Sequence, residues 1–247
     1  MHTRRNSPGS DCPLISIIIV VFQDCRELQS VLESVLPQRS NQVEVIVIDG
    51  GSHDGTLEFL QEHDSEIDYW LSEPDRGLYD AMNKGIAVAR GRFICHINAG
   101  DRLLNLPISE LLRADAENAD IVSFNVLLDG KRNYRPRIGL RLRINNTLHH
   151  QGTFYRRSSF PGYNLKYKVF ADFDVNQRLA RRGALIRLSD TVVAWHNTAG
   201  VSHQNRGAIE LYQVVASNYG IPYVPFSWLD QTWQALKCRV KRLTKSM

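Results

Sequence analysis

The chain has 247 residues, of which 43% are apolar, and a formal charge of +4 from 30 basic and 26 acidic side chains. This length and apolar content can bury the core of one large α/β domain or two small ones, which excludes a fibrous or disordered chain. The charge excess is mild and does not indicate a nucleic-acid-binding protein. The cysteines form no C-x-x-C pair, which favours reduced thiols in a cytosolic compartment over a disulfide framework. They are Cys12, Cys25, Cys95 and Cys238.

The N-terminus resembles a secretory signal peptide, because Arg4 and Arg5 precede an apolar run. The resemblance ends after Phe22, since residues 23–27 offer no small-residue cleavage site. No apolar run approaches the ~20 residues that a membrane-spanning helix needs. We therefore expect a soluble chain whose residues 1–12 are a disordered tail.

Strand and helix patterns alternate along the first hundred residues. Apolar, β-branched runs predict strands at residues 14–22, 43–48, 67–71 and 93–98. Apolar residues at helical spacing predict helices over 28–35, from 55 onward and over 78–90, the first behind a capping box of Asp24 and Glu27. This alternation predicts an α/β fold with a Rossmann-type, mostly parallel sheet that has helices on both faces.

Open sheets of this kind bind ligands beyond the carboxyl ends of their strands. Polar segments follow three of the expected strands, at residues 23–24, 49–55 and 98–101. No two glycines stand two residues apart, so the dinucleotide fingerprint G-x-G-x-x-G is absent, and neither a P-loop nor a serine-hydrolase elbow occurs. Another kind of ligand site is therefore expected at this edge of the sheet.

The second half of the chain is less regular. Residues 131–143 hold six Lys/Arg and no acid, which is typical of a flexible, solvated basic loop. Residues 149–157, 171–183 and 192–204 follow as candidate loop-strand, helix and strand-loop segments.

An amphipathic and basic helix is expected within a C-terminal extension over residues 206–247. Apolar residues recur there at alternating steps of four and three, and lysines and arginines gather near the end. Two interpretations stay open: the helix packs on its own domain, or it lies on an anionic membrane surface, which the tryptophans and the basic excess favour. The apolar residues are Leu229, Trp233, Leu236, Val240 and Leu243.

Three of the segments at strand ends, "VIDGGSHDGT", "SEPDRGLYDAMNKGIAVARG" and "INAGD", together resemble the inverting nucleotide-sugar glycosyltransferases of family two. The likeness is to bacterial enzymes of exopolysaccharide, capsule and O-antigen assembly of the colanic-acid type. It covers residues 13–205, and the run D-x-G-x-Y-D-A-M-N-K-G is long enough to be specific.

The resemblance implies a GT-A glycosyltransferase domain over residues 13–205. It implies inverting transfer of a hexose from a nucleotide-sugar donor, with UDP preferred and dTDP and GDP open. The acceptor would be a saccharide or a polyprenyl-diphosphate-linked glycan, with no nucleic acid as partner. Such an enzyme would be cytoplasmic or peripheral on the inner face of the plasma membrane.

Asp101 comes directly after two small residues that let a ligand approach the backbone. A divalent cation bound through one or two carboxylates commonly holds a nucleotide diphosphate, although residues 98–101 are also typical of a simple turn. The resemblance places them at the family's D-x-D motif and implies that Asp101 binds Mn²⁺ or Mg²⁺, with His196 or His203 completing the site. Asn98 departs from the motif, because many relatives carry Asp there.

Asp49 ends the second expected strand, where its carboxylate can accept a hydrogen bond from a ring N–H of a base. Gly51 permits close contact there. The resemblance implies a nucleobase site at this place, with Phe22 and Asn98 also in the donor site. Asp54 is expected to cap the next helix.

Arg76 and Lys84 can bind phosphate oxygens of the donor. Asp80 can contact the sugar or Lys84 one helical turn later. The donor-binding roles of these three residues rest mainly on the resemblance.

Inverting transfer needs a base that takes the proton of an acceptor hydroxyl as it attacks the anomeric carbon. In "ADFD", Asp172 and Asp174 are two residues apart and cannot both point the same way, so one of them can cap the helix instead. The resemblance aligns this segment with E-D-x-D, although Ala171 replaces the first acid. It implies that Asp172 is the base and Asp174 its orienting partner.

His150 and Gln151 precede an expected strand, where the family often has His-Gln near the acceptor or donor sugar. A structural role for the histidine is the alternative.

Two other protein classes remain as alternatives to a glycosyltransferase. A sugar-nucleotide pyrophosphorylase would need an early Gly-rich signature that is missing, and a non-catalytic sugar-nucleotide-binding protein would be expected to lack Asp101 or Asp172.

Overall fold

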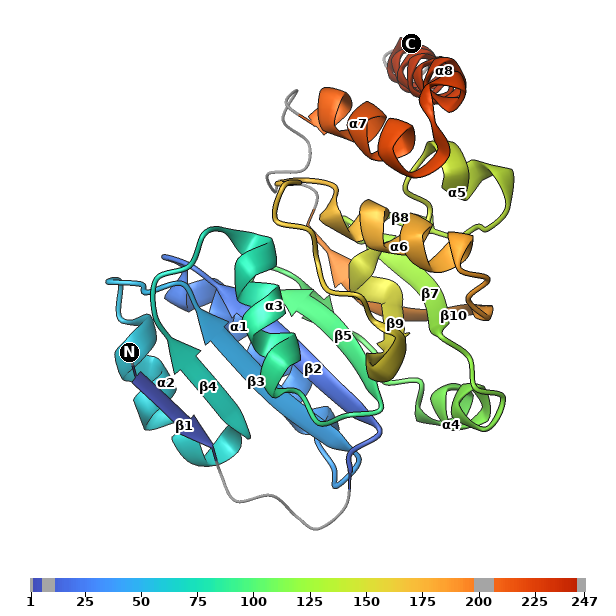
Figure 1. Ribbon diagram of the computed structural model, residues 1–247. Coiled ribbons are helices and arrows are strands. Elements are labelled where there is room, and N and C mark those ends of the chain that lie inside the picture. Colours follow the sequence, from blue (N-terminus) through green and yellow to red (C-terminus); the bar gives the residue numbers. More distant parts are fainter. Residues whose placement is uncertain (1, 6–11, 198–206, 244–247) are drawn as a thin grey trace.

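A computed structural model describes residues 2–5, 12–197 and 207–243 (Figure 1). The strands are β1 (His2–Arg5), β2 (Ile15–Val21), β3 (Val43–Asp49), β4 (Tyr69–Ser72), β5 (Phe93–Asn98), β6 (Arg102–Leu103), β7 (Ile121–Leu128), β8 (Arg132–Tyr134), β9 (Thr153–Arg156) and β10 (Ile186–His196). The α-helices are α1 (Cys25–Val35), α2 (Thr56–Glu62), α3 (Leu78–Val88), α4 (Ile108–Ala116), α5 (Leu140–Ile144), α6 (Ala171–Arg181), α7 (Gly207–Tyr219) and α8 (Val224–Leu243).

The first half of the sheet is parallel, in the order β4-β3-β2-β5. The register pairs Val21 of β2 with Asp49 and Val20 with Asn98, so the strands end at one edge of the sheet. Helices cover both faces. Odd-numbered residues of β2 pack with α1, while Ile18 and Val20 pack in a second cluster with residues of α3 and α6. The expected Rossmann-type half of the fold is therefore confirmed.

The second half of the sheet is mixed. β9 pairs antiparallel with β5 on one side and with β7 on the other, and β10 runs parallel to β7. The described strands thus form one continuous ten-stranded sheet in the order β1-β4-β3-β2-β5-β9-β7-β10-β6, with β8 beside β7. This continuity joins the parallel half to the part of the chain that the sequence pattern left irregular.

Two segments differ from the sequence-based expectation. Residues 1–12 were expected to be a disordered tail, but His2–Arg5 form β1, which adds an antiparallel edge strand to β4. Residues 131–143 were expected to be a flexible loop, but they contain β8 and α5. The strands β1 and β8 gain their order by backbone pairing with β4 and β7, which their polar sequences do not indicate.

The C-terminal helices α7 and α8 lie beyond α6 and α5 at one end of the molecule (Figure 1). Glu210 of α7 accepts hydrogen bonds from the backbone N–H groups of residues 168–170, just before α6. No helix within the described ranges is long and apolar enough to cross a membrane.

Candidate active site

A cavity of about 1050 Å³ lies at the carboxyl edge of the sheet. It joins the two halves of the fold, because its walls come from the end of β5, the start of α3, the start of α6 and the end of β10. It is lined by site residues that the sequence predicts, namely Arg76, Asp80, Asn98, Asp101, His150, Gln151, Asp172 and His196.

Asp101 occupies one wall of this cavity and is only 3% exposed. Its Oδ1 accepts hydrogen bonds from His196 Nδ1 at 2.7 Å and from the backbone N–H of Asn197 at 3.3 Å. Its Oδ2 accepts a hydrogen bond from Gln151 Nε2 at 2.7 Å. The same ring nitrogen of His196 lies 3.0 Å from Gln151 Nε2. Asp101 is therefore held in a fixed orientation by the end of β10 and by the turn before β9.

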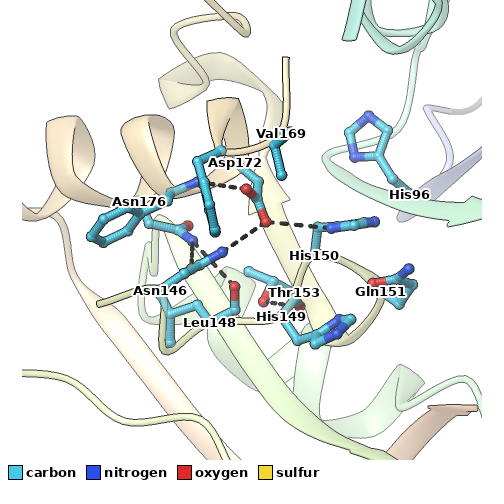
Figure 2. Close-up of polar contacts among 12 residues, drawn as sticks. His96, Asn146, Leu148, His149, His150, Gln151, Thr153, Val169, Asp172 and Asn176 are labelled. Atoms are coloured by element: carbon cyan, nitrogen blue, oxygen red, sulfur yellow. Dashed lines mark hydrogen bonds and ion pairs between the residues drawn. The ribbon is translucent and has the colours of Figure 1, made fainter. Parts of the chain in front are cut away.

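Asp172 lies in the first turn of α6 and is 5% exposed. Its carboxylate points toward Asn146 and His150 (Figure 2). Its Oδ2 accepts a hydrogen bond from Asn146 Nδ2 at 2.9 Å and lies 3.4 Å from His150 Nδ1. Its Oδ1 accepts from the backbone N–H of Phe173 at 2.8 Å and lies 3.3 Å from the hydroxyl of Tyr79. Donors from several elements thus fix this second carboxylate.

Tyr79 of α3 is one of these neighbours, and its hydroxyl donates to the carbonyl of Val169 at 2.7 Å. Burial raises the pKa of Tyr79 well above its ordinary value of 10, and the nearby charge of Asp172 adds to the effect. The phenol therefore stays protonated and supports the loop before α6.

A short 3₁₀ turn, η3 (His150–Gly152), contacts both carboxylates. His150 reaches Asp172, whereas Gln151 is fully buried and reaches Asp101. Asn98, the last residue of β5, places Nδ2 3.1 Å from His150 Nε2. These polar residues, far apart in the chain, form one connected network.

Asp174 does not line the cavity. Its Oδ2 accepts a hydrogen bond from Arg178 Nε at 2.8 Å, and its Oδ1 accepts one from Asn218 Nδ2 of α7 at 3.0 Å. The residue is 3% exposed and fastens α6 to α7. The two aspartates of "ADFD" therefore point in different directions, as their spacing predicts, and neither is the N-cap, which is Phe170.

Asp49 is fully buried at the end of β3. Its carboxylate accepts hydrogen bonds from the backbone N–H and hydroxyl of Ser52 and from the hydroxyl of Ser72. Asp49 thus holds the loop after β3 in shape. Asp54 supports the same loop by accepting from the backbone N–H groups of Cys25 and Thr56, although the N-cap of α2 is Gly55.

Phe22 is 63% exposed beside this loop. A Cβ on Gly50 would lie 3.0 Å from its ring and 2.6 Å from Asp75 Oδ2, so the two side chains would have to shift to admit one. Gly51 has a φ of +84° and packs against the backbone of Pro74, which again requires glycine. The loop carries an open aromatic face beside a tightly packed backbone.

Arg76, Asp80 and Lys84 do not act as one cluster. Arg76 lines the cavity, and its Nη2 lies 2.9 Å from Asp80 Oδ1. The hydrogen bond from Arg76 lowers the pKa of Asp80 against an opposing effect of burial. Lys84 is outside the cavity lining, since its Nζ donates to the carbonyl of Pro74 and pairs with Glu73.

His203 lies outside the described residues. Several cavity residues are not predicted from the sequence, because they carry no motif and reach the site only through tertiary packing. They include Arg132, Tyr134, Asn146, Lys168 and Gln234. His196 could be found from the sequence only as an alternative to His203.

The polar atoms near Asp101 are suited to a hard cation. The amide oxygens Asn98 Oδ1 and Gln151 Oε1 are buried without a hydrogen-bond partner, and carboxylate and amide oxygens are the ligands that Mg²⁺ and Mn²⁺ favour. Among the described residues, no three His, Cys, Asp or Glu side chains are preassembled as a metal cage. The donor set therefore fits a cation whose ligands would be Asp101 and oxygen atoms of a bound substrate.

A Rossmann-type sheet joined to a mixed half, with two carboxylates facing one cavity at the strand ends, is the architecture of glycosyltransferases that use nucleotide sugars. The chain belongs to glycosyl transferase family 2, whose model matches residues 16–188. It is a glycosyltransferase with the GT-A fold.

Curated relatives agree with this assignment. The chain is 32% identical over 201 residues to a PGL/p-HBAD biosynthesis glycosyltransferase of Mycobacterium bovis, covering 76% of this chain and 78% of the relative. It is 32% identical over 217 residues to an uncharacterized glycosyltransferase of Mycobacterium tuberculosis, covering 81% of each. A cholesterol galactosyltransferase of Borreliella burgdorferi is 29% identical over 111 residues, or 44% of this chain and 31% of that protein.

Solved structures share the fold. TarS 1–349 of S. aureus superposes with a TM-score of 0.64 at 16% identity, covering 83% of this chain and 64% of that chain. The chain thus spans slightly less than two thirds of this neighbour. The mannosyltransferase PcManGT from Pyrobaculum calidifontis, solved in complex with GDP-Man and Mn²⁺, gives a TM-score of 0.61 at 14% identity and covers 98% of this chain and 84% of that chain.

Proposed function

We propose that the protein is a metal-dependent, inverting hexosyltransferase of bacterial surface polysaccharide synthesis. It moves a sugar from a UDP-sugar to a saccharide acceptor carried on a polyprenyl diphosphate. The observation that carries this proposal is that Asp101 and Asp172 line the same cavity. One carboxylate is then available for the donor and the other for the acceptor.

The acceptor side of the proposal assigns proton transfer to Asp172. As the acceptor oxygen bonds to the anomeric carbon, the bond from that carbon to the diphosphate oxygen breaks, and the hydroxyl proton passes to a carboxylate oxygen of Asp172. The hydrogen bond from Asn146 keeps the carboxylate aimed at the cavity. Inversion follows because the base acts opposite the departing diphosphate.

The donor side assigns the cation to Asp101, assisted by the amide oxygen of Gln151 and by His196 or His203. A bound Mn²⁺ or Mg²⁺ supplies Lewis-acid stabilisation of the charge that develops on the leaving diphosphate. Arg76 lies in the same cavity and binds diphosphate oxygens in this proposal. The side chain of Asn98 is an uncharged amide where many relatives carry a second acid, so the site holds one negative charge fewer.

The remaining donor contacts lie at the loop after β3. The exposed ring of Phe22 stacks on the nucleobase, while Asp49 and Gly51 give the loop its shape. UDP is the proposed nucleotide, and TarS has been solved with UDP and with UDP-GlcNAc. Asp80 orients Arg76, and Lys84 braces the loop through Glu73.

The acceptor side supports a lipid-linked substrate. His150 lies between Asn98 and Asp172, where it can contact the acceptor or donor sugar. A relative named for cholesterol galactosyl transfer acts on an apolar acceptor. The proposed location is the cytoplasm, at the inner face of the plasma membrane, with α8 meeting anionic lipid.

A thermal-shift screen tests the donor half of this proposal. UDP, dTDP and GDP are each added with and without Mn²⁺. A nucleotide at 100 times its dissociation constant stabilises the folded state by about 2.7 kcal/mol. Stabilisation by UDP that requires Mn²⁺ is the expected result. Equal stabilisation without any divalent cation would contradict metal dependence. Turnover with UDP-hexoses and a polyprenyl-linked acceptor extract then identifies the transferred sugar.

A further inference from the structure

Helix α8 is attached to the domain through its polar side. Ser227 Oγ donates to the carbonyl of Ile144 at 2.6 Å, and Asp230 Oδ2 accepts from Asn145 Nδ2 at 2.8 Å. Gln231 Nε2 donates to Asn145 Oδ1 at 3.2 Å. The contacts between α8 and the end of α5 are thus hydrogen bonds from one face of the helix.

The apolar side of α8 faces solvent instead. Its large side chains follow each other at steps of three, four and three residues, so they form one stripe along the helix. They are Phe226, Leu229, Trp233 and Leu236, each 53–60% exposed. The contacts of α8 with its own domain therefore leave this stripe exposed in the described part of the helix.

A basic segment lies next to α8 at the same end of the molecule. We call residues 131–143, which include β8 and α5, the basic segment; Arg135, Arg137 and Arg141 are exposed there. Arg141 Nη2 lies 3.7 Å from Asp230 of α8, which ties the segment to the helix. In the described part of the chain, no carboxylate forms an ion pair with Arg135 or Arg137.

The basic segment also exposes apolar side chains beside its cations. Ile138 is 48% exposed and Leu140 is 73% exposed. Exposed apolar residues between arginines are typical of surfaces that meet a lipid headgroup layer, where apolar groups insert and cations meet phosphates.

We infer that the basic segment and α8 form one docking surface for an anionic phospholipid bilayer, with the mouth of the active-site cavity at its border. Arg132 of the basic segment and Gln234 of α8 both line the cavity. The surface therefore reaches the cavity from two elements. This goes beyond attachment by a single helix, because the segment contributes charge and the pair fixes the orientation of the cavity.

Charge decides between a bilayer and a second copy of the chain as the occupant. In a symmetric dimer the same patch meets itself, which would bring the arginines of both basic segments together. Like charges at a desolvated interface cost free energy. An anionic bilayer is complementary to the cations and also accepts the tryptophan and leucine side chains at its interface.

This orientation deepens the proposed function and rests on it, since a cavity that opens at the bilayer surface receives an acceptor whose lipid stays in the membrane. Bilayer binding itself needs no turnover. Donor binding measured without vesicles tests the proposed glycosyltransferase chemistry alone. Vesicle binding measured without donor tests the docking surface alone, so the two can fail separately.

The experiment is co-sedimentation of the full chain with vesicles of phosphatidylcholine, with or without phosphatidylglycerol. We expect binding to the mixed vesicles that weakens with added salt. Since each Lys or Arg near an anionic surface is worth about 1 kcal/mol, the double variant Arg135→Gln/Arg137→Gln should bind roughly thirtyfold more weakly. The matched control is Arg26→Gln/Arg113→Gln, which removes two exposed arginines from α1 and α4.

The apolar stripe is tested by Leu229→Ser/Trp233→Ser. We expect loss of binding to mixed vesicles, while Leu104→Ser/Leu112→Ser, at exposed positions in and just before α4, binds normally. Circular dichroism melting confirms that each variant is folded.

Three results would overturn the inference. The first is equal binding of the wild-type chain to both vesicle types. The second is unchanged binding of the Arg135→Gln/Arg137→Gln variant, which would remove the basic segment from the surface. The third is a dimer in solution that dissociates in the Leu229→Ser/Trp233→Ser variant, because the occupant would then be a second copy.

Discussion

His150 and Gln151 are adjacent in the chain, yet their side chains contact two different carboxylates of the cavity. His150 Nδ1 lies 3.4 Å from Asp172, and Gln151 Nε2 lies 2.7 Å from Asp101. Successive side chains diverge by about 120° in a 3₁₀ turn, which has three residues per turn. One short turn therefore sets the arrangement of the two carboxylates on which the proposed chemistry depends.

Asp172→Asn should separate catalysis from binding. If Asp172 is the base, donor affinity should stay near that of the wild type while turnover falls by about a hundredfold to ten-thousandfold. Isothermal titration with UDP-sugar and a transfer assay measure the two quantities.

Asp174→Asn is the matched control, because it makes the same change two residues away. It should retain most of the turnover but lower the free energy of unfolding by about 1–3 kcal/mol, since Arg178 and Asn218 lose a charged partner. If Asp174→Asn abolishes transfer and Asp172→Asn does not, the base is Asp174. If neither variant affects transfer, His150 is the next candidate.

Asp101→Asn should abolish the effect of the metal on nucleotide binding. In the wild type, Mn²⁺ should strengthen UDP binding; in the variant, the affinities with and without Mn²⁺ should be the same. Asp24→Asn is the control, because Asp24 also lines the cavity and undergoes the same loss of charge. Retained Mn²⁺ dependence in Asp101→Asn would leave residues 98–101 as a turn without a metal role.

Phe22→Ala should weaken donor binding with little effect on the melting temperature. Stacking of a base on an aromatic ring is worth about 1–3 kcal/mol, so the dissociation constant for UDP should rise by about five- to hundredfold. Phe226→Ala is the control, since Phe226 is 60% exposed on α8 and Phe22 is 63% exposed. Equal UDP affinity in both variants would remove Phe22 from the donor site.

Stability should fall in mild acid because of His96 on β5. Burial lowers the pKa of His96 from 6.5 to about 3, and the nearby His150 contributes. At pH values between these two pKa values, the His96 ring is protonated in the unfolded chain but not in the folded chain. The free energy of unfolding therefore falls by about 1.4 kcal/mol for each pH unit of acidification.

Denaturant unfolding at several pH values between 3.5 and 6.5 measures this slope (roughly the window over which linkage acts). His96→Gln should be less stable at neutral pH, because the contact of His96 with the Tyr163 hydroxyl changes, but its pH dependence should be shallower. His53→Gln, at an exposed position, should keep the wild-type slope. A wild-type slope in His96→Gln would assign the acid sensitivity to other groups.

The parallel half of the fold could be predicted from the sequence because its signals are local. The run from Ile15 to Val21 is apolar at almost every position, and Asp24 accepts a hydrogen bond from the backbone N–H of Glu27 as the capping pattern predicts. Strand ends then follow from the pattern, and with them the position of Asp101.

The mixed half could not be predicted in the same way. β9 has only four residues, and its place between β5 and β7 depends on pairing with segments 30–63 residues away. Asn146 and Tyr79 reach Asp172 only through this packing. Asp49 illustrates the opposite case: its position after β3 was predicted, but local sequence gives no sign that Ser52 and Ser72 enclose its carboxylate.

The double pairing of β9 has a consequence for how the enzyme accommodates substrates. β9 is hydrogen-bonded to β5 and to β7. The segments that carry Asp101 and His150 are therefore attached to the same continuous sheet. The ladder hydrogen bonds restrict changes in the separation of the strands that carry these two segments. A larger or smaller sugar must therefore be matched by exchanging side chains on the walls, so changes of donor sugar should evolve by substitution and not by a change in domain closure.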